Sequence, residues 1–195
     1  MKTIALTLIL LLGLPLRLFA AVGCDLNDPD RDVARLFPGS TGYKTRYVSI
    51  KDAGGQALLE KVEARLGDKF HGLYETIDVP YTVYEVLKGQ SRIGYIHGVN
   101  QKGVYGGLQV FLVLDLSGVV KGFYFQKLTS RHAKALRAPE FGRQFEGLSL
   151  KDFPPSGYPD LKNPAPGAEK DFRAALRGVK KNLILMDEFV FGERK

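Results

Sequence analysis

Residues 81–128 constrain the fold most strongly, because they hold four strand-length apolar segments separated by short turns. "YTVYEVLKG" and "RIGYIHGV" flank Gly89–Ser91, and "LQVFLVLDL" and "VVKGFYFQKL" flank a turn that ends at Gly118. Connections this short join antiparallel strands as hairpins. The segment 108–114 is apolar almost throughout, so we expect both of its faces to be covered.

The segments on either side of these strands complete an α+β pattern. Apolar residues recur at helical spacing from Leu58 to Leu66, ahead of Gly67, which predicts a helix that ends at the glycine. The remaining expected elements are strands at 46–50, 74–79 and 183–191, two short helices within 130–147 that break at Pro139, an irregular proline-rich stretch at 153–167, and an amphipathic helix from about 168. The sequence therefore predicts a twisted, mainly antiparallel sheet packed with helices.

The first 23 residues have the layout of a secretory signal. One lysine precedes the apolar run, and small residues precede Cys24. The run holds about 13 apolar residues, too few for a bilayer span of roughly 20. We therefore divide the chain into a signal peptide at 1–23, a polar tether at 24–32 and a domain at 33–195.

Cys24 is the only cysteine in the chain, so the protein cannot form an internal disulfide. The residues before it complete "AVGC", which resembles the lipidation site of bacterial lipoproteins. This resemblance predicts a lipid on Cys24 and a location on the periplasmic side of the cytoplasmic membrane. The alternative is a free or intermolecular thiol.

The charge of the chain bears on its partners. The formal net charge is +7, and it falls to +5 when Lys2 and Arg17 leave with residues 1–23. The tightest basic group is 177–181, and the other basic residues are spread out. An exported protein rarely meets nucleic acid, so we expect the basic surface to face an anionic membrane or an acidic partner.

A glycine-rich loop, "GVYGG" at 103–107, separates the two predicted hairpins. Phosphate-binding loops and dinucleotide fingerprints of similar glycine density open a helix, whereas a strand follows here. Two interpretations stay open. The loop is a bulge or tight turn at the start of a strand, or Gly106 and Gly107 let a flat ring approach the main chain.

The order of motifs around this loop resembles the bacterial FMN-binding domain. That domain occurs in the flavin subunits of sodium-pumping NADH:quinone reductase and of the Rnf complex, and in the nitrous-oxide reductase maturation regulator. The matching pieces are "ARLFPGS" at 34–40, Gly94-Tyr95, the "GVYGG" loop, Val113–Gly118 and "FGRQFEG" at 141–147. The resemblance spans roughly 33–185 and implies FMN as cofactor.

The resemblance departs at the flavin attachment motif. Covalent members carry "S-G-A-T" at the start of the last helix, where the threonine is linked to the flavin phosphate. Here Gly167 and Ala168 match its middle, Pro166 stands for the serine and Glu169 stands for the threonine. Glutamate has no hydroxyl to esterify, and its charge repels a phosphate. The sequence therefore predicts that FMN is held non-covalently.

The resemblance also suggests which residues lie at the cofactor. The cofactor-binding residues expected from it are Tyr105, Gly106, Gly107, Lys127, Thr129, Arg131, His132, Gly167 and Ala168. Lys134 and Arg137 are further possible sources of positive charge, and the alternative for these basic residues is a solvated helix face.

Two functions follow from these expectations. The first is an exported, membrane-anchored FMN-binding-domain protein that serves as an accessory electron-transfer component rather than as a stand-alone enzyme. The alternative is a flavin-free scaffold or binding module that docks a periplasmic cytochrome or a membrane redox complex. The three histidines show no metal-ligand spacing, and no catalytic constellation stands out.

Overall fold

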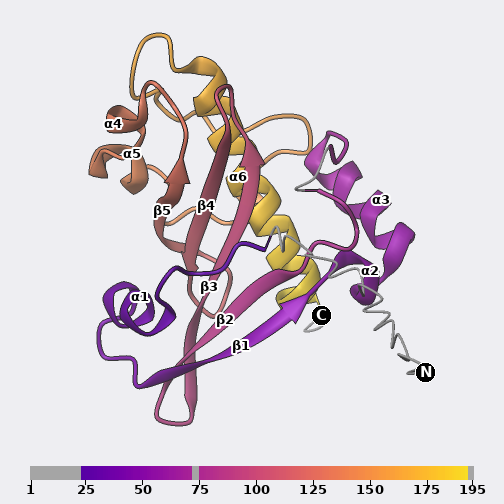
Figure 1. Cartoon of the computed structure of the whole chain (residues 1–195). Coiled ribbons are helices and arrows are strands. Elements are labelled where there is room, and N and C mark those ends of the chain that lie inside the picture. The colour runs from indigo at the N-terminus through magenta and orange to yellow at the C-terminus, as the bar shows by residue number, and fades with distance from the viewer. Residues whose placement is uncertain (1–22, 72–74, 193–195) are drawn as a thin grey trace, which may run out of the picture.

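The computed structural model describes residues 23–71 and 75–192 and contains a five-stranded sheet in the order β1-β2-β3-β4-β5 (Figure 1). The strands are β1 Gly42–Val48, β2 Tyr81–Lys88, β3 Ser91–Lys102, β4 Gly107–Leu114 and β5 Val120–Leu128, and each neighbouring pair is antiparallel. The predicted antiparallel sheet and α+β class are confirmed. At the β4–β5 turn, the Asp115 carboxylate accepts the N–H groups of Ser117 and Val119, and Gly118 adopts φ +84°.

One face of the sheet is covered by a long helix, α6 Glu169–Met186, which crosses β3 and β4 (Figure 1). The helix α3, Gly55–Leu66, packs beside it, and the short helix α2, Ile50–Ala53, precedes α3. Gly67 ends α3 in the left-handed conformation, as predicted. The main hydrophobic core lies between these helices and the sheet, with residues such as Leu112 and Val179 fully buried.

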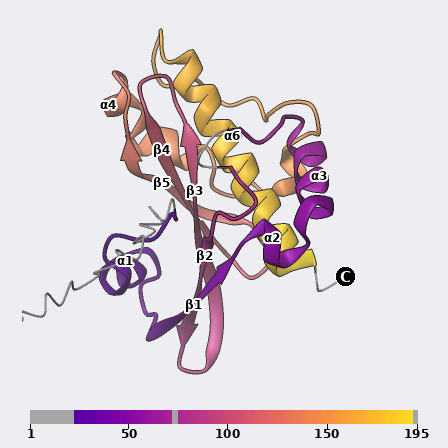
Figure 2. The same ribbon diagram turned by 45° about the vertical axis from the view of Figure 1, so that its right-hand side comes forward.

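The opposite face carries the helix α1, Pro29–Leu36, whose N-cap is Asp28 (Figure 2). A second, smaller apolar cluster joins Cys24, Leu26 and Val33 to Phe111 of β4. Apolar side chains therefore cover both faces of β4, as its sequence predicts.

Of residues 24–32, expected to form a polar tether, the first lie against the sheet and the last begin α1. Cys24 and Leu26 are buried on the α1 side of the sheet, and the Leu26 N–H donates to the Tyr84 hydroxyl at 3.0 Å. The Thr82 hydroxyl donates to the Asp25 carboxylate at 2.5 Å. The two apolar residues alternate with polar ones, so an extended segment buries them together while its polar groups bond to the sheet.

Two predicted strands are wrong. Residues 75–80 form turns, because Glu75 bends inward to bind buried basic groups of α6. Residues 183–191 continue α6 and then form the π-helix η2, Asp187–Phe191. The run from Leu183 to Met186 is apolar on every side because sheet, α3 and neighbouring loops enclose this end of the helix. A fully enclosed helix and a buried strand have the same apolar pattern.

The segment between β5 and α6 follows the prediction more closely. It holds the short helices α4 Ala133–Leu136 and α5 Pro139–Arg143, the 3-10 turn η1 Leu150–Asp152, and then an irregular stretch up to α6. Pro139 begins α5, so the predicted break is confirmed. Of these elements, α5 packs against β5, which ends the sheet on that side (Figure 1), and η1 contacts α6.

Candidate functional site

Three segments that are distant in sequence meet at one corner of the sheet, which we call the glycine corner: residues 103–107, 129–132 and 167–171. The Thr129 N–H donates to the Gly107 carbonyl at 3.3 Å. The Val104 N–H donates to Asp171 Oδ1 at 2.9 Å. A Cβ on Gly167 would lie 3.5 Å from the His132 ring. The structure thus brings together every residue that the resemblance places at the cofactor, with Lys127 two residues before this corner on β5.

Asp171 organises the corner, a role that the sequence did not reveal, because there it is only an acid in the first turn of the last helix. Its carboxylate is 2% exposed and accepts hydrogen bonds from the Val104 N–H and from the Ser130 hydroxyl at 2.5 Å. It therefore ties the glycine loop and the chain after β5 to the first turn of α6. The sequence feature that could have revealed this role is the helical spacing: Asp171 lies four residues before Ala175, on the buried face of α6.

The glycines of the loop allow close packing of the protein's own side chains. A Cβ on Gly103 would lie 2.5 Å from Leu108 Cδ1 and 3.0 Å from Asp171 Oδ1, and one on Gly106 would lie 3.0 Å from Thr129 Cβ. Gly106 also adopts φ +155°. The Gly103 N–H donates to the Gly106 carbonyl at 2.8 Å, which closes a tight turn. The loop therefore has the geometry of a tight turn at the start of a strand, one of the two interpretations that the sequence left open.

The start of α6 already holds negative charge. The Glu169 carboxylate accepts from its own N–H and from the Gly167 N–H, and these backbone bonds hold the pKa of Glu169 below its usual range. Such amides at a helix start are the groups that bind a phosphate. Here Glu169 occupies two of them, and the buried carboxylate of Asp171 lies in the same helix turn. A flavin phosphate at this position would have to displace the Glu169 carboxylate and would lie in the same helix turn as the negative charge of Asp171.

The outer surface of the corner is basic and partly apolar. Val104 and Tyr105 are 48% and 47% exposed, and the Arg131 guanidinium lies 4.8 Å from the centroid of the Tyr105 ring. The exposed basic residues of 102–107, 127–134 and 167–173 are Lys102, Lys127, Arg131, Lys134, Lys170 and Arg173. The same segments contain two acids, Glu169 and Asp171, so their formal net charge is +4, compared with +5 for residues 24–195.

Other basic residues have structural roles. Arg137, considered as a source of charge for a phosphate, donates to the main-chain carbonyls of Phe125 and Gln126 and so fastens α4 to β5. In the basic group at 177–181, Lys180 and Lys181 are both buried. Lys180 donates to four carbonyls, including that of Leu66 at 3.0 Å. This group therefore contributes little to the charged surface.

A buried polar network lies between α6 and β3. Lys181 Nζ lies 2.7 Å from the Glu75 carboxylate, which also pairs with Arg177 at 2.6 Å. His97 is fully buried, its Nδ1 lies 2.9 Å from Asn182 Oδ1, and burial lowers the pKa of His97 to about 4. The ring is therefore neutral at pH 7. His97 holds the helix on the sheet and is a packed residue.

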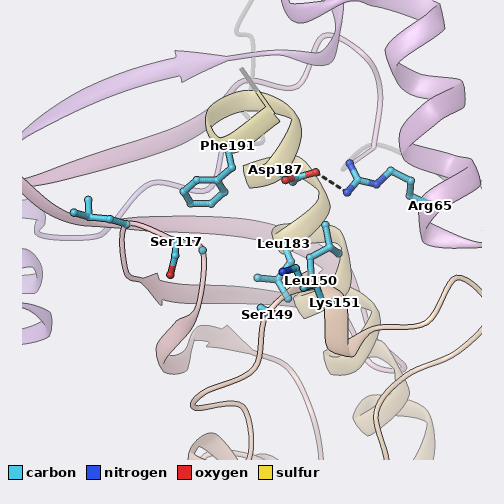
Figure 3. Close-up of a pocket in the computed structure, with 10 residues that line it drawn as sticks. Arg65, Ser117, Ser149, Leu150, Lys151, Leu183, Asp187 and Phe191 are labelled. Carbon is cyan, nitrogen blue, oxygen red and sulfur yellow. Dashed lines mark hydrogen bonds and ion pairs between the residues drawn. The ribbon is translucent and has the colours of Figure 1, made fainter. Parts of the chain in front are cut away.

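A pocket of about 430 Å³ lies between the β4–β5 turn, η1 and the end of α6 (Figure 3). Several of its polar groups already have protein partners: Arg65 pairs with Asp187 at 2.6 Å, and Ser117 and Ser149 bond to neighbouring carboxylates. None of the residues expected at the cofactor lines this pocket.

Cys24 is 1% exposed, and burial raises the pKa of its thiol well above its usual range. Its sulfur would lie 2.9 Å from a Cβ on Gly98. A lipid on this sulfur requires residues 23–26 to leave the sheet. Lipidation stays a prediction, and the signal segment, residues 1–22, lies outside the described residues.

Comparison with known proteins finds no family model and no curated protein that matches this chain. In residues 23–71 and 75–192, no helix is both long and apolar enough to cross a bilayer. The same residues contain no group of three or more His, Cys, Asp or Glu side chains placed to hold a metal ion.

Proposed function

We propose that this chain is an accessory docking module of an exported redox chain, and that its glycine corner binds the acidic face of a partner protein without flavin. One observation carries the proposal. Glu169 takes up two amides at the start of α6, Asp171 takes up the Val104 N–H and the Ser130 hydroxyl beside them, and the exposed surface around both acids is basic. The corner is therefore suited to a partner that approaches from outside rather than to a nucleotide held within it.

The surface has the parts that a protein interface needs. Tyr105 and Val104 offer about half of their surface to solvent at the tip of the β3–β4 hairpin. Aromatic side chains at the centre of a patch, with charge at the rim, are typical of interfaces. The rim charge is expected to speed association with an acidic surface and to fix its orientation. The expected partner, a cytochrome or a membrane redox complex, comes from the family resemblance.

Site-specific crosslinking in cells tests this proposal. A photoreactive phenylalanine analogue is placed at position 105, and the crosslinked protein is identified by mass spectrometry. Tyr47, 66% exposed on β1, is the matched control position. We expect a redox protein with an acidic surface to crosslink from position 105 alone, and the crosslink to disappear in the variant K127E/R131E.

The same experiment has an outcome that contradicts the proposal. Equal crosslinking from positions 47 and 105, or a crosslink that survives the charge reversal, would show that the corner does not select the partner. Circular dichroism of each variant checks that the fold is intact.

The second candidate function is electron transfer through non-covalent FMN. The observation in its favour is the exposed ring of Tyr105 beside Arg131, an aromatic surface outside the filled corner. The purified full-length chain would then be yellow and would release FMN on acid treatment. A colourless chain that takes up no added FMN favours the docking module. In the variant Glu169→Thr, acid-stable flavin added by a flavin transferase would support the alignment with the covalent motif.

A further inference from the structure

The ring of Tyr105 and the guanidinium group of Arg131 form a contact pair on the outer surface of the glycine corner. The guanidinium carbon lies 4.8 Å from the ring centroid, and both side chains are exposed. We propose that this Tyr105–Arg131 pair is a preformed binding site for one carboxylate of the partner protein, and that it selects the partner more strongly than the net charge of the corner does. This inference rests on the proposed function and adds to it the chemistry that the partner presents.

The main chain that carries Tyr105 is fixed from within the corner. The Val104 N–H donates to the buried carboxylate of Asp171 at 2.9 Å. The Gly103 N–H donates to the Gly106 carbonyl at 2.8 Å, so Tyr105 lies inside a closed turn. The protein therefore sets the backbone position of this ring before a partner arrives.

The main chain that carries Arg131 is fixed by the same carboxylate. The Ser130 hydroxyl donates to Asp171 at 2.5 Å and accepts the His132 N–H at 3.0 Å, which ties the residues on both sides of Arg131 to each other. Asp171 thus bonds to Val104 and to Ser130, the residues that directly precede the two members of the pair. It is a positioning residue, and a site that is ordered in advance loses less freedom on binding.

The guanidinium group of Arg131 has hydrogen-bond donors to offer. Among the described residues it forms no ion pair with an acid, whereas Arg177 of α6 pairs with Glu75. Contact with a ring orients the guanidinium group without using its N–H groups as donors. These N–H groups form a planar fork that matches the two oxygens of a carboxylate. The pair is therefore suited to a carboxylate.

The apolar surface beside the pair indicates what surrounds that carboxylate. Val104 and Tyr105 are each about half exposed, and no charge lies on either side chain. An Asp or Glu of the partner with an apolar neighbour would place its carboxylate on Arg131 and the neighbour on Val104. Arginine and tyrosine are also frequent among the few residues that dominate the binding energy of an interface. A lipid phosphate has the same charge and paired oxygens, so the experiment separates it from a protein carboxylate.

The experiment places the photoreactive phenylalanine analogue at position 104, which leaves Tyr105 and Arg131 unchanged. The full-length chain is produced in cells at a low level, so that the yield of the crosslink follows the affinity. We expect Arg131→Gln to lower the yield of the protein crosslink about tenfold, because a bidentate charged contact is lost. Arg131→Lys should lower it nearly as much, because lysine keeps the charge but has no planar fork.

Two further variants separate recognition by the pair from attraction by net charge. Lys127→Gln is the matched control: it removes one exposed positive charge near the same corner and should lower the yield less than about twofold. Asp171→Ala makes the corner more basic, so net charge alone would raise the yield. We expect a decrease instead, because the pair loses its alignment. Circular dichroism checks each variant, and the exposed positions 127 and 131 keep the test independent of the buried one.

The outcomes distinguish this inference from the function on which it rests. A parent chain that crosslinks from position 104 no more than from position 47 would contradict the docking function, and the carboxylate site with it. The docking function would stand, and the carboxylate site would be overturned, if Arg131→Gln and Lys127→Gln weakened the crosslink equally, if Arg131→Lys left it unchanged, or if a folded Asp171→Ala strengthened it. A crosslink to phospholipid in place of protein would overturn both.

Discussion

Replacing Asp171 with alanine is expected to release the glycine loop from α6. The buried carboxylate accepts from the Val104 N–H and the Ser130 hydroxyl, and hydrogen bonds to charged groups contribute about 1.5–3 kcal/mol each. Part of this is offset because the carboxylate no longer has to be desolvated. We therefore expect Asp171→Ala to lower the free energy of unfolding by about 2–4 kcal/mol. Asp171→Asn keeps an acceptor for Val104, so its loss should be about 1 kcal/mol.

Urea unfolding followed by circular dichroism measures the change in stability, and hydrogen exchange measures the local effect. In Asp171→Ala, the amides of 103–107 should exchange faster, while those of β2 should change only with the global stability. Glu169→Gln is the matched control, because its carboxylate is exposed in the same helix turn. Unchanged exchange at 103–107 in Asp171→Ala would refute the claim that this carboxylate holds the loop.

The remaining predictions concern charge, close packing and the thiol. Burial disfavours the charged form of Glu75, yet Lys181 beside it holds the pKa of Glu75 below the usual 4.5. The stability that this pair adds is therefore present above pH 4.5 and is lost as the pH falls through the lower pKa of the folded state. Urea unfolding at pH 3–7 would show this loss. Gly106→Ala should lower the free energy of unfolding by about 1–3 kcal/mol, through backbone strain and the contact of the new Cβ with Thr129. T129G in the same chain should recover part of that loss. Strictly additive effects in the double-mutant cycle would argue against the contact. The Cys24 thiol, if it carries no lipid, should react at least tenfold faster with a thiol reagent in urea than in the native chain, and fast native labelling would contradict its burial.

Local patterns were enough to predict most of the fold. The four strands of 81–128, the helix that ends at Gly67 and the break at Pro139 each depend on neighbours within a few residues, and the structure confirms them. The helical end at 183–191 was missed because its apolar residues face several different elements. Periodicity cannot distinguish such a helix from a buried strand.

The candidate site was harder to predict, because its chemistry depends on partners that are distant in sequence. The family resemblance grouped Tyr105 with Gly167, and the structure places their segments side by side. The sequence did not reveal that Asp171 fills the space between them. It also showed Lys181 as part of a basic group, although Glu75, 106 residues earlier, holds that lysine in the core.

The arrangement of β4, apolar on both faces, has a consequence for how the chain reaches its native state. Strands β2–β5 are contiguous and joined by short turns, so they can pair early from local contacts. Until α6 arrives from one end of the sequence and residues 23–36 from the other, this meander exposes Val110 on one side and Phe111 on the other. An incomplete copy that lacks either covering segment would present a bare apolar surface, and self-association is the expected fate of such a fragment.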